Sequence, residues 1–78
     1  MKLLTISDLT ARGLGERSFI YDQISKGCLP PPVKLSRRIA RWPECEIDRL
    51  IGFLVAEPKR EELKNFVGEL LTNRKVSA

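Results

Sequence analysis

Three consecutive prolines at positions 30–32 set the strongest limit on how this chain can fold. Proline lacks a backbone N–H and has a fixed φ, so no helix can continue through such a run. The chain has 78 residues, which is enough for one domain at most. Its helices must therefore lie before and after the prolines. The run itself is either a rigid spacer or, as its context favours, a stiff lead into a strand.

Two short helices are expected before the prolines. Residues 3–6 form an apolar lead-in, and Ser7 is a suitable N-cap for a helix over residues 8–12. After a turn that contains glycines, a second helix is predicted over about residues 16–26, with Gly27 at its end as the C′ residue. The apolar side of this second helix is predicted to consist of Phe19, Ile20 and Ile24. Two short helices joined in this way are typical of a helix-turn-helix.

A hairpin is expected directly after the prolines. Residues 33–35 and 39–42 have the pattern of two short strands, and residues 36–38 form the turn between them. Two strands alone are marginally stable, so they must pack on helices. Trp42, at the end of the second strand, is predicted to be a core residue that locks the hairpin onto the helices. Base stacking by this ring is the alternative.

Two amphipathic helices are predicted in the second half of the chain. Proline and acidic residues at 43–46 suit the start of a third helix. A break at residues 57–58 precedes a fourth helix over about residues 58–74. The apolar positions of the two helices are Ile47, Leu50, Ile51 and Leu54, and then Leu63, Phe66, Val67, Leu70 and Leu71. The predicted fold is mostly α with a small β-hairpin: a winged helix-turn-helix with an additional C-terminal helix.

The charge is unevenly distributed along the chain. The net charge is +4, of which residues 1–43 contribute +5 and residues 44–78 contribute −1. A basic half predicts a polyanionic partner, such as DNA, for the first part of the chain. The predicted hairpin carries four of its cations: Lys34, Arg37, Arg38 and Arg41. A protruding basic ribbon suits phosphates, although hairpins that bind nothing also carry charges that prevent edge pairing.

The second helix supplies the other candidate contacts with DNA. Arg17 and Ser18 lie in its first turn, where they can reach base edges or phosphates. Tyr21 and Lys26 can donate to phosphates further along the helix. Arg17 can instead be an ordinary surface charge, and Tyr21 can be a half-buried packing residue.

Catalysis and metal binding find little support in the sequence. The chain has no histidine and two cysteines, Cys28 and Cys45, so the ligands of a zinc site are absent and a disulfide is allowed only by count. We expect no enzyme activity, no cofactor and no metal. The chain also lacks an apolar run long enough for a membrane span and a signal peptide, so a cytoplasmic protein is expected.

Several motifs together resemble a known family. The segment 18–27 resembles the helix segment of AlpA-like phage and prophage regulatory proteins. Leu29-Pro30, Pro32-Val33-Lys34-Leu35, Arg38 and Trp42 match the wing pattern of that family at the same spacing, and Glu46-Ile47-Asp48 fits the start of its third helix. The resemblance covers roughly residues 3–55. The same pattern is similar to small excisionases and to the winged-helix part of MerR-type regulators.

This resemblance implies a DNA-binding protein of a prophage or mobile element. Family members bind DNA through the helix that begins near Arg17 and through the wing. They act as excisionases, which are recombination directionality factors that bend attachment-site DNA, or as transcriptional regulators of integrase or excision genes. The positions that carry over are Ser18, Tyr21, Lys34 and Arg38. Arg37 and Arg41 depart from the usual pattern and make this wing more basic, and Ser36 stands where glycine is frequent.

The residue pattern and the resemblance together set the expected domain organisation and partners, and the fourth helix lies outside the resemblance. Residues 1–57 would form the winged-helix DNA-binding domain, and residues 58–78 a C-terminal amphipathic helix that packs on it or mediates association. The expected partner is double-stranded DNA at an attachment site or promoter, with integrase as a candidate partner and self-association on DNA as a hypothesis. The alternative function is a protein-interaction adaptor that docks on another regulator through the C-terminal helix or the wing.

Overall fold

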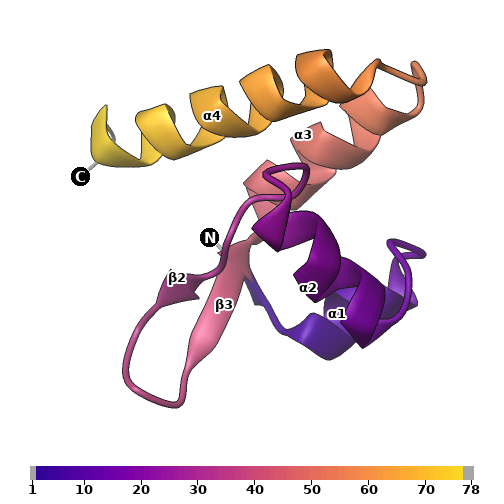
Figure 1. Ribbon diagram of the computed structural model, residues 1–78. Helices are drawn as coiled ribbons and strands as arrows, with labels where there is room; N and C mark the ends of the chain where they lie inside the picture. The colour runs from indigo at the N-terminus through magenta and orange to yellow at the C-terminus, as the bar shows by residue number, and fades with distance from the viewer. Residues whose placement is uncertain (1, 77–78) are drawn as a thin grey trace.

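The computed structural model describes residues 2–76, which form four helices and three short strands (Figure 1). In chain order these are β1 (Leu3–Leu4), α1 (Ile6–Ala11), α2 (Arg17–Ser25), β2 (Val33–Lys34), β3 (Ala40–Pro43), α3 (Glu44–Leu54) and α4 (Arg60–Val76). The fold is mostly α with a small hairpin and a C-terminal helix, as the sequence predicts. No helix in the described residues is long and apolar enough to span a membrane.

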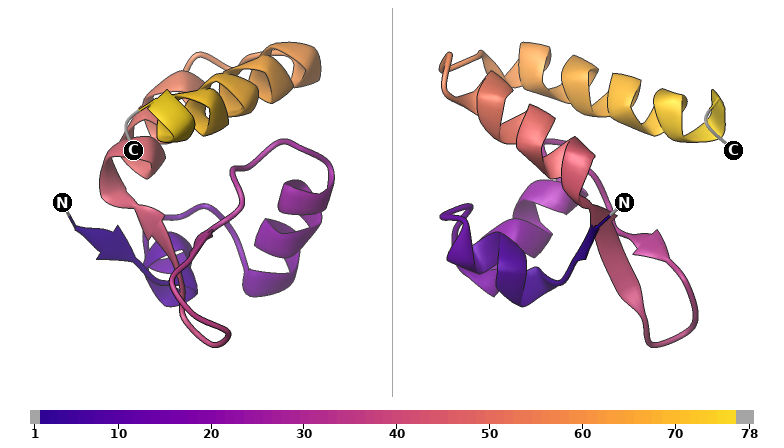
Figure 2. Two further views of the ribbon diagram at one scale, coloured as in Figure 1. Left: turned by 90° about the vertical axis from the view of Figure 1, so that its left-hand side faces the viewer. Right: turned by 180° about the vertical axis from the view of Figure 1, so that it is seen from behind.

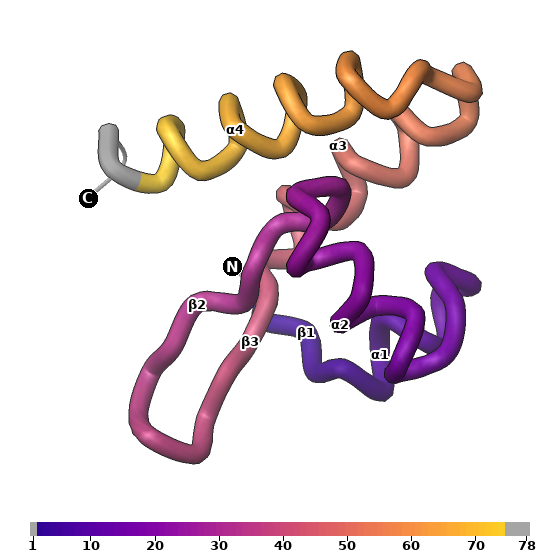
Figure 3. Tube along the Cα trace, in the orientation of Figure 1, coloured from indigo at the N-terminus to yellow at the C-terminus, as the bar shows by residue number. Residues whose placement is uncertain are grey.

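The elements are arranged on two sides of α3. Helix α4 runs alongside α3 on one side, while α1, α2 and the β2–β3 hairpin lie on the other (Figures 1 and 2). The hairpin projects from the body, as the Cα trace makes plain (Figure 3). The core between these elements contains Leu4, Leu9, Ile20, Leu29, Trp42, Ile47, Leu50 and Val67. All four helices and the base of the sheet therefore contribute to one hydrophobic core.

The sheet has a third strand that the sequence pattern does not predict. Its order is β1-β3-β2, with both pairs antiparallel. The expected apolar lead-in at residues 3–6 is in part a strand, because Leu3 pairs with Pro43 and Leu4 with Trp42. A two-residue strand shows no alternation of its own, so only its partner about forty positions away reveals it. The added strand ties the N-terminus to the base of the hairpin.

Helix α1 begins at Ile6, two residues earlier than predicted. Its N-cap is Thr5 and not Ser7, because Thr5 and Asp8 form a capping box. The Asp8 N–H donates to Thr5 Oγ1 at 3.1 Å, and the Thr5 N–H donates to Asp8 Oδ2 at 2.9 Å. Both Thr5 and Ser7 are good caps by residue type, but only Thr5 has an acidic side chain three positions later.

Helix α2 confirms the predicted end but not all of the predicted apolar side. Gly27 follows the C-cap with φ +77°, as a C′ glycine should. Ile20 is fully buried, whereas Phe19 is 51% exposed and does not belong to the core side. The Phe19 ring lies over Gly15, where an added Cβ would sit 2.6 Å from Phe19 Cδ2. The glycine in the turn before α2 therefore makes room for this ring.

Trp42 anchors the hairpin in the core. It is 1% exposed, and its Nε1–H donates to the carbonyl oxygen of Pro30 at 2.8 Å. The prediction of core packing is confirmed, and base stacking by this buried ring is excluded. Because prolines leave their carbonyl groups free to accept, the run at 30–32 is both stiff and fastened to the strand it leads into.

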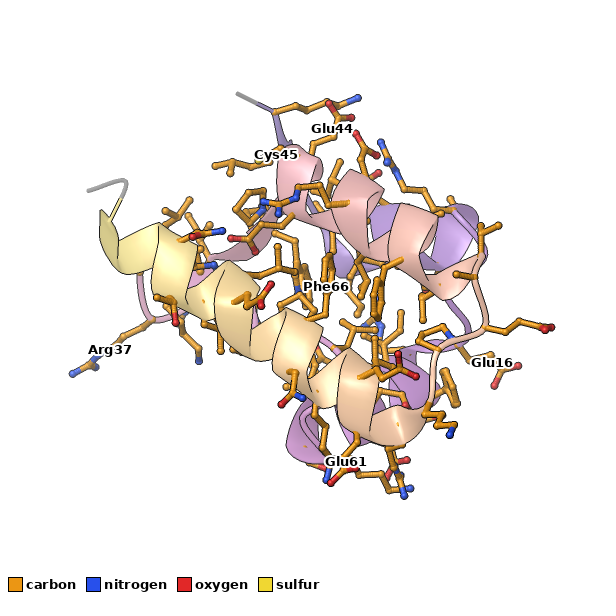
Figure 4. All side chains as sticks on the ribbon, turned by 90° about the horizontal axis from the view of Figure 1, so that it is seen from above. Glu16, Arg37, Glu44, Cys45, Glu61 and Phe66 are labelled. Carbon is orange, nitrogen blue, oxygen red and sulfur yellow. The ribbon has the colours of Figure 1, made fainter. Side chains whose placement is uncertain are left out.

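Helices α3 and α4 pack against each other along their apolar stripes. Phe53 and Phe66 stack with ring centroids 4.4 Å apart and planes 3° from parallel. Phe66 lies between α4 and α3 in the view from above (Figure 4), and Val67 and Leu70 are buried. Helix α4 starts at Arg60, two residues after the predicted start, and the break before it includes Glu57 with φ +52°. The two cysteines are free thiols, Cys28 buried and Cys45 exposed.

Candidate nucleic-acid interface

A short loop joins the two strands of the hairpin, and hydrogen bonds to the Ser36 side chain stabilise it. Strands β2 and β3 are in register with Val33 opposite Arg41 and Lys34 opposite Ala40. The Leu35 N–H donates to the Ile39 carbonyl at 2.8 Å, so residues 36–38 form the turn, as predicted. Ser36 Oγ accepts from the N–H of Arg38 at 3.4 Å and from that of Ile39 at 3.2 Å. A serine can thus occupy this position because its hydroxyl satisfies donors in the loop.

The predicted hairpin cations are presented to solvent. Lys34, Arg37 and Arg38 are exposed, and Arg37 points away from the body of the molecule (Figure 4). Arg41 is half-buried and donates through Nη1 to the Ala40 carbonyl at 2.9 Å. In the part of the chain that the structure describes, no carboxylate is within 4.0 Å of any of these four cations. Their charge is available to a polyanion.

The candidate residues of α2 fall at two different ends of that helix. Arg17 and Ser18 form its exposed first turn, and Tyr21 is 52% exposed in the next. Lys26 is the C-cap at the other end, where its Nζ is 3.0 Å from Asp22 Oδ2. A Cβ on the neighbouring Gly27 would lie 3.9 Å from Lys64, so this end is beside α4.

The first turn of α2 and the hairpin tip share one side of the molecule. Both lie on the side away from α4 in two roughly perpendicular views (Figures 1 and 2). Arg17 and Ser18 therefore join the cations of the hairpin on a common side, whereas Lys26 lies at the opposite end of its helix. We call the group Arg17, Ser18, Tyr21, Lys34, Arg37, Arg38 and Arg41 the basic side.

Two arginines outside the basic side are held in structural ion pairs. Arg12 donates to Asp48 Oδ1 at 2.6 Å and to Glu44 Oε2 at 2.7 Å, which ties the end of α1 to the first turns of α3. The hydrogen bond to Asp48 is the main cause of a raised pKa for Arg12. Near the start of α1, the backbone N–H of Thr5 and its hydroxyl lower the pKa of Asp8.

The second ion pair connects α4 with the proline run. Arg74 donates to both carboxylate oxygens of Glu46, at 2.7 and 2.6 Å, and to the Pro31 carbonyl at 2.9 Å. The Glu46 side chain is 9% exposed, so this is a nearly buried, bidentate contact. Sequence reasoning misses it because the two partners are 28 positions apart and no local pattern links them. Together with Trp42, Arg74 fixes the segment that leads into the hairpin.

The described residues contain no group of three His, Cys, Asp or Glu side chains that could hold a metal ion. The chemistry of the basic side is that of hydrogen-bond donors and positive charge. Such a surface can bind phosphates and base edges.

Comparison with known families gives a match over much of this region. Residues 8–57 match the family described as prophage CP4-57 regulatory protein (AlpA). The match runs from within α1 to just beyond α3 and so includes the whole basic side, while α4 lies outside it. No curated protein and no solved structure matches the chain.

Proposed function

This chain belongs to the AlpA family of prophage regulatory proteins, and from that premise we propose that it binds specific sites in double-stranded DNA. In this proposal α2 enters the major groove with its first turn foremost, as the recognition helix of a helix-turn-helix does. The β2–β3 hairpin acts as a wing that contacts the neighbouring backbone or minor groove. The protein works by binding, without a cofactor and without catalysis.

One observation carries the proposal: no carboxylate among the described residues pairs with the hairpin cations, and the hairpin tip shares a side with the first turn of α2. Arg12 and Arg74, by contrast, are paired with carboxylates: Arg12 with Glu44 and Asp48, and Arg74 with the nearly buried Glu46. A protein that used these cations only for solubility would not need them gathered on one side. Lys26 contributes least, because it pairs with Asp22 and lies beside α4.

We further propose that the DNA site is an attachment site or a promoter of the element that encodes the protein. There the protein would act as an excisionase or as a transcriptional regulator of integrase or excision genes. Integrase and further copies of this chain are candidate partners at that site. The alternative, an adaptor that docks through α4, is less favoured because Val67 and Leu70 of its apolar stripe are 3% and 1% exposed.

A gel-shift titration tests the proposal. The probes are duplexes from the DNA that flanks the protein's own gene and from the nearest attachment site, with random duplexes of equal length as controls. We expect selective shifts that weaken steeply as the salt concentration rises, because phosphate contacts release counterions. A folded protein that shifts no duplex at low salt would show the proposal to be wrong. Bending of the shifted attachment-site probe would favour excision over transcriptional control.

A further inference from the structure

One side chain of α4 contacts both hairpin roots. This name covers the two segments that join the hairpin to the body: residues 30–32, directly before β2, and residues 44–46, directly after β3. The Arg74 guanidinium donates to the two Glu46 carboxylate oxygens at 2.7 and 2.6 Å, and to the Pro31 carbonyl at 2.9 Å. One root therefore supplies the carboxylate, the other root supplies the carbonyl, and Arg74 connects them.

This contact restrains movement at both roots. The Glu46 side chain is 9% exposed and the Arg74 side chain is 21% exposed, so water competes weakly for either group. A guanidinium holds its donors at fixed angles, so a bidentate contact fixes orientation as well as position. Pro31 has a fixed φ, and the prolines on either side of it are equally stiff. A movement of one root against the other must break at least one of the three hydrogen bonds.

Arg74 belongs to a part of the chain that the family match leaves out. The match covers residues 8–57, and α4 begins at Arg60. Within the matched residues, the hairpin is fastened by Trp42, whose Nε1–H donates to the Pro30 carbonyl at 2.8 Å. Arg74 bonds the next carbonyl of the proline run and joins it to α3. Helix α4 therefore adds a second anchor to the one that the matched residues contain.

The position of the hairpin relative to α2 depends on these roots. Strand β3 packs against β1 and α3, while α2 packs against α1. The hairpin then projects from the body (Figure 3). A projecting hairpin that moved at its roots would have to be ordered when DNA binds, which lowers affinity. A hairpin that is already held in the free protein avoids this loss.

We propose that Arg74 is a positioning residue for DNA binding. By connecting the two roots, it keeps the cations of the hairpin tip in a fixed place relative to the first turn of α2, so that both can contact one DNA site. Arg74 does not contact DNA in this proposal, because its guanidinium is engaged by Glu46 and Pro31. The inference rests on the proposed function and adds α4, which lies outside the family match, as a determinant of affinity.

The first test is made on the protein without DNA. NMR relaxation measures the order parameters of the backbone amides in residues 35–39. Arg74→Ala should lower them towards the values below about 0.6 that are typical of flexible backbone. Arg74→Lys should have an intermediate effect, because a single ammonium lacks the fixed fork of the guanidinium. Unchanged order parameters in Arg74→Ala would overturn the inference.

Leu63→Ala is the control for a general loss of stability. Leu63 is a partly buried residue of α4 that packs against the core, three turns before Arg74. Its replacement weakens the packing of α4 without removing a bond to either hairpin root. The order parameters of residues 35–39 should therefore stay at the wild-type level. An equal decrease in Leu63→Ala and Arg74→Ala would mean that Arg74 acts only through overall stability, and would overturn the inference.

The second test measures affinity for the duplex selected by the gel-shift titration. Each variant is assayed at a temperature at which circular dichroism shows it to be folded. Arg74→Ala should weaken binding about tenfold, because the hairpin must now be ordered on binding. Arg60→Ala removes the same charge from the same helix and should weaken binding far less, and Leu63→Ala should bind like the wild type.

A double-mutant cycle shows whether Arg74 acts through the hairpin tip. If it does, its loss should matter little once the tip cations are absent. In the Arg37→Ala/Arg38→Ala background, Arg74→Ala should weaken binding by less than about twofold. Tenfold losses in both backgrounds would mean that Arg74 acts elsewhere, and would overturn the inference.

The failure of this inference differs from the failure of the proposed function. If the wild type binds its duplex selectively and folded Arg74→Ala binds equally tightly, the inference is wrong and the proposed function stands. A folded wild type that binds no duplex at any salt concentration would overturn the proposed function and this inference with it.

Discussion

The hairpin and α4 each carry four cations but use them in different ways. Residues 33–43 contain no carboxylate, whereas α4 also contains Glu61, Glu62 and Glu69. The arginines of the hairpin turn are exposed to solvent, while Arg74 of α4 is bound by Glu46 and by the Pro31 carbonyl. The two regions also differ in the exposure of their apolar side chains. The hairpin exposes Leu35 and Ile39, and α4 buries Val67 and Leu70.

This difference distinguishes the part of the molecule that we propose contacts DNA from the part that supports it. Stability should depend on α4 and on the base of the hairpin, where side chains are buried and Arg74 is paired with Glu46. DNA binding should depend on the hairpin tip, where side chains are exposed and the cations have no carboxylate partner among the described residues. Total charge does not reveal this division, because equal numbers of cations can be free or neutralised.

Trp42→Ala should have the largest effect, because it removes the ring that anchors the hairpin in the core. We expect a loss of about 4 kcal/mol in the free energy of unfolding, enough to unfold much of a domain this small. Urea or thermal unfolding followed by circular dichroism measures it. The Pro30 carbonyl would also lose its donor. A stable, folded variant would mean that the base of the hairpin is not part of the supporting region.

Arg74→Ala should cost somewhat less, roughly 2–3 kcal/mol, because it leaves the nearly buried Glu46 carboxylate without its partner. Arg60→Ala, on the same helix but without an ion pair in the described residues, is the matched control and should change stability by less than about 0.5 kcal/mol. The double variant Glu46→Gln/Arg74→Ala should recover part of the loss, since no unpaired charge remains. If Arg74→Ala and Arg60→Ala changed the free energy of unfolding equally, the pair between Arg74 and Glu46 would not stabilise the fold. The cations of α4 would then not differ from those of the hairpin in this respect.

Arg37→Ala/Arg38→Ala should leave stability within about 0.5 kcal/mol of the wild type, because both side chains are exposed and unpaired in the described part of the chain. Its effect should appear only in binding, as a loss of roughly tenfold to thirtyfold in DNA affinity at low salt. Arg60→Ala/Lys64→Ala removes the same charge from α4 and should reduce affinity far less. If both double variants bind equally weakly, net charge and not the hairpin determines binding.

The sequence predicts the parts of this fold that local patterns determine. The proline run, the stripe at Ile47 and Leu50, and the C′ role of Gly27 each depend on residues a few positions apart. Strand β1 and the Glu46–Arg74 pair escape prediction because each depends on a partner distant in the chain. Long-range partners leave no periodic signal in a single sequence.

The candidate site is predictable in composition but not in arrangement. All eight predicted residues lie at least partly exposed, as DNA contacts must. Nothing local indicates that Lys26 pairs with Asp22 beside α4, or that Arg41 is half-buried. The sequence also hides the exposure of Leu35 and Ile39, because apolar residues in a strand are normally expected to face a core.

Helix α1 offers the smallest test, because Asp8 is held by Thr5 much as Arg74 of α4 is held by Glu46. The Thr5 N–H and hydroxyl favour ionised Asp8 and lower its pKa below the ordinary value of 3.8. A lowered pKa in the folded state means that the contribution of Asp8 to stability is fully present above about pH 4 and is lost as the pH falls through the folded-state pKa. Asp8→Asn should therefore be less stable than the wild type at neutral pH, and the difference should shrink as the pH falls below the ordinary pKa of 3.8.

Thermal melts at several pH values measure this effect, with Asp22→Asn as a control that removes a carboxylate from the exposed pair with Lys26. A difference between Asp8→Asn and the wild type that stays constant with pH would mean that the capping box acts through its shape and not through its charge. DNA affinity at neutral pH should be the same for Asp8→Asn and the wild type as long as both are folded. A loss of DNA affinity in folded Asp8→Asn would mean that α1 also belongs to the part of the molecule that contacts DNA.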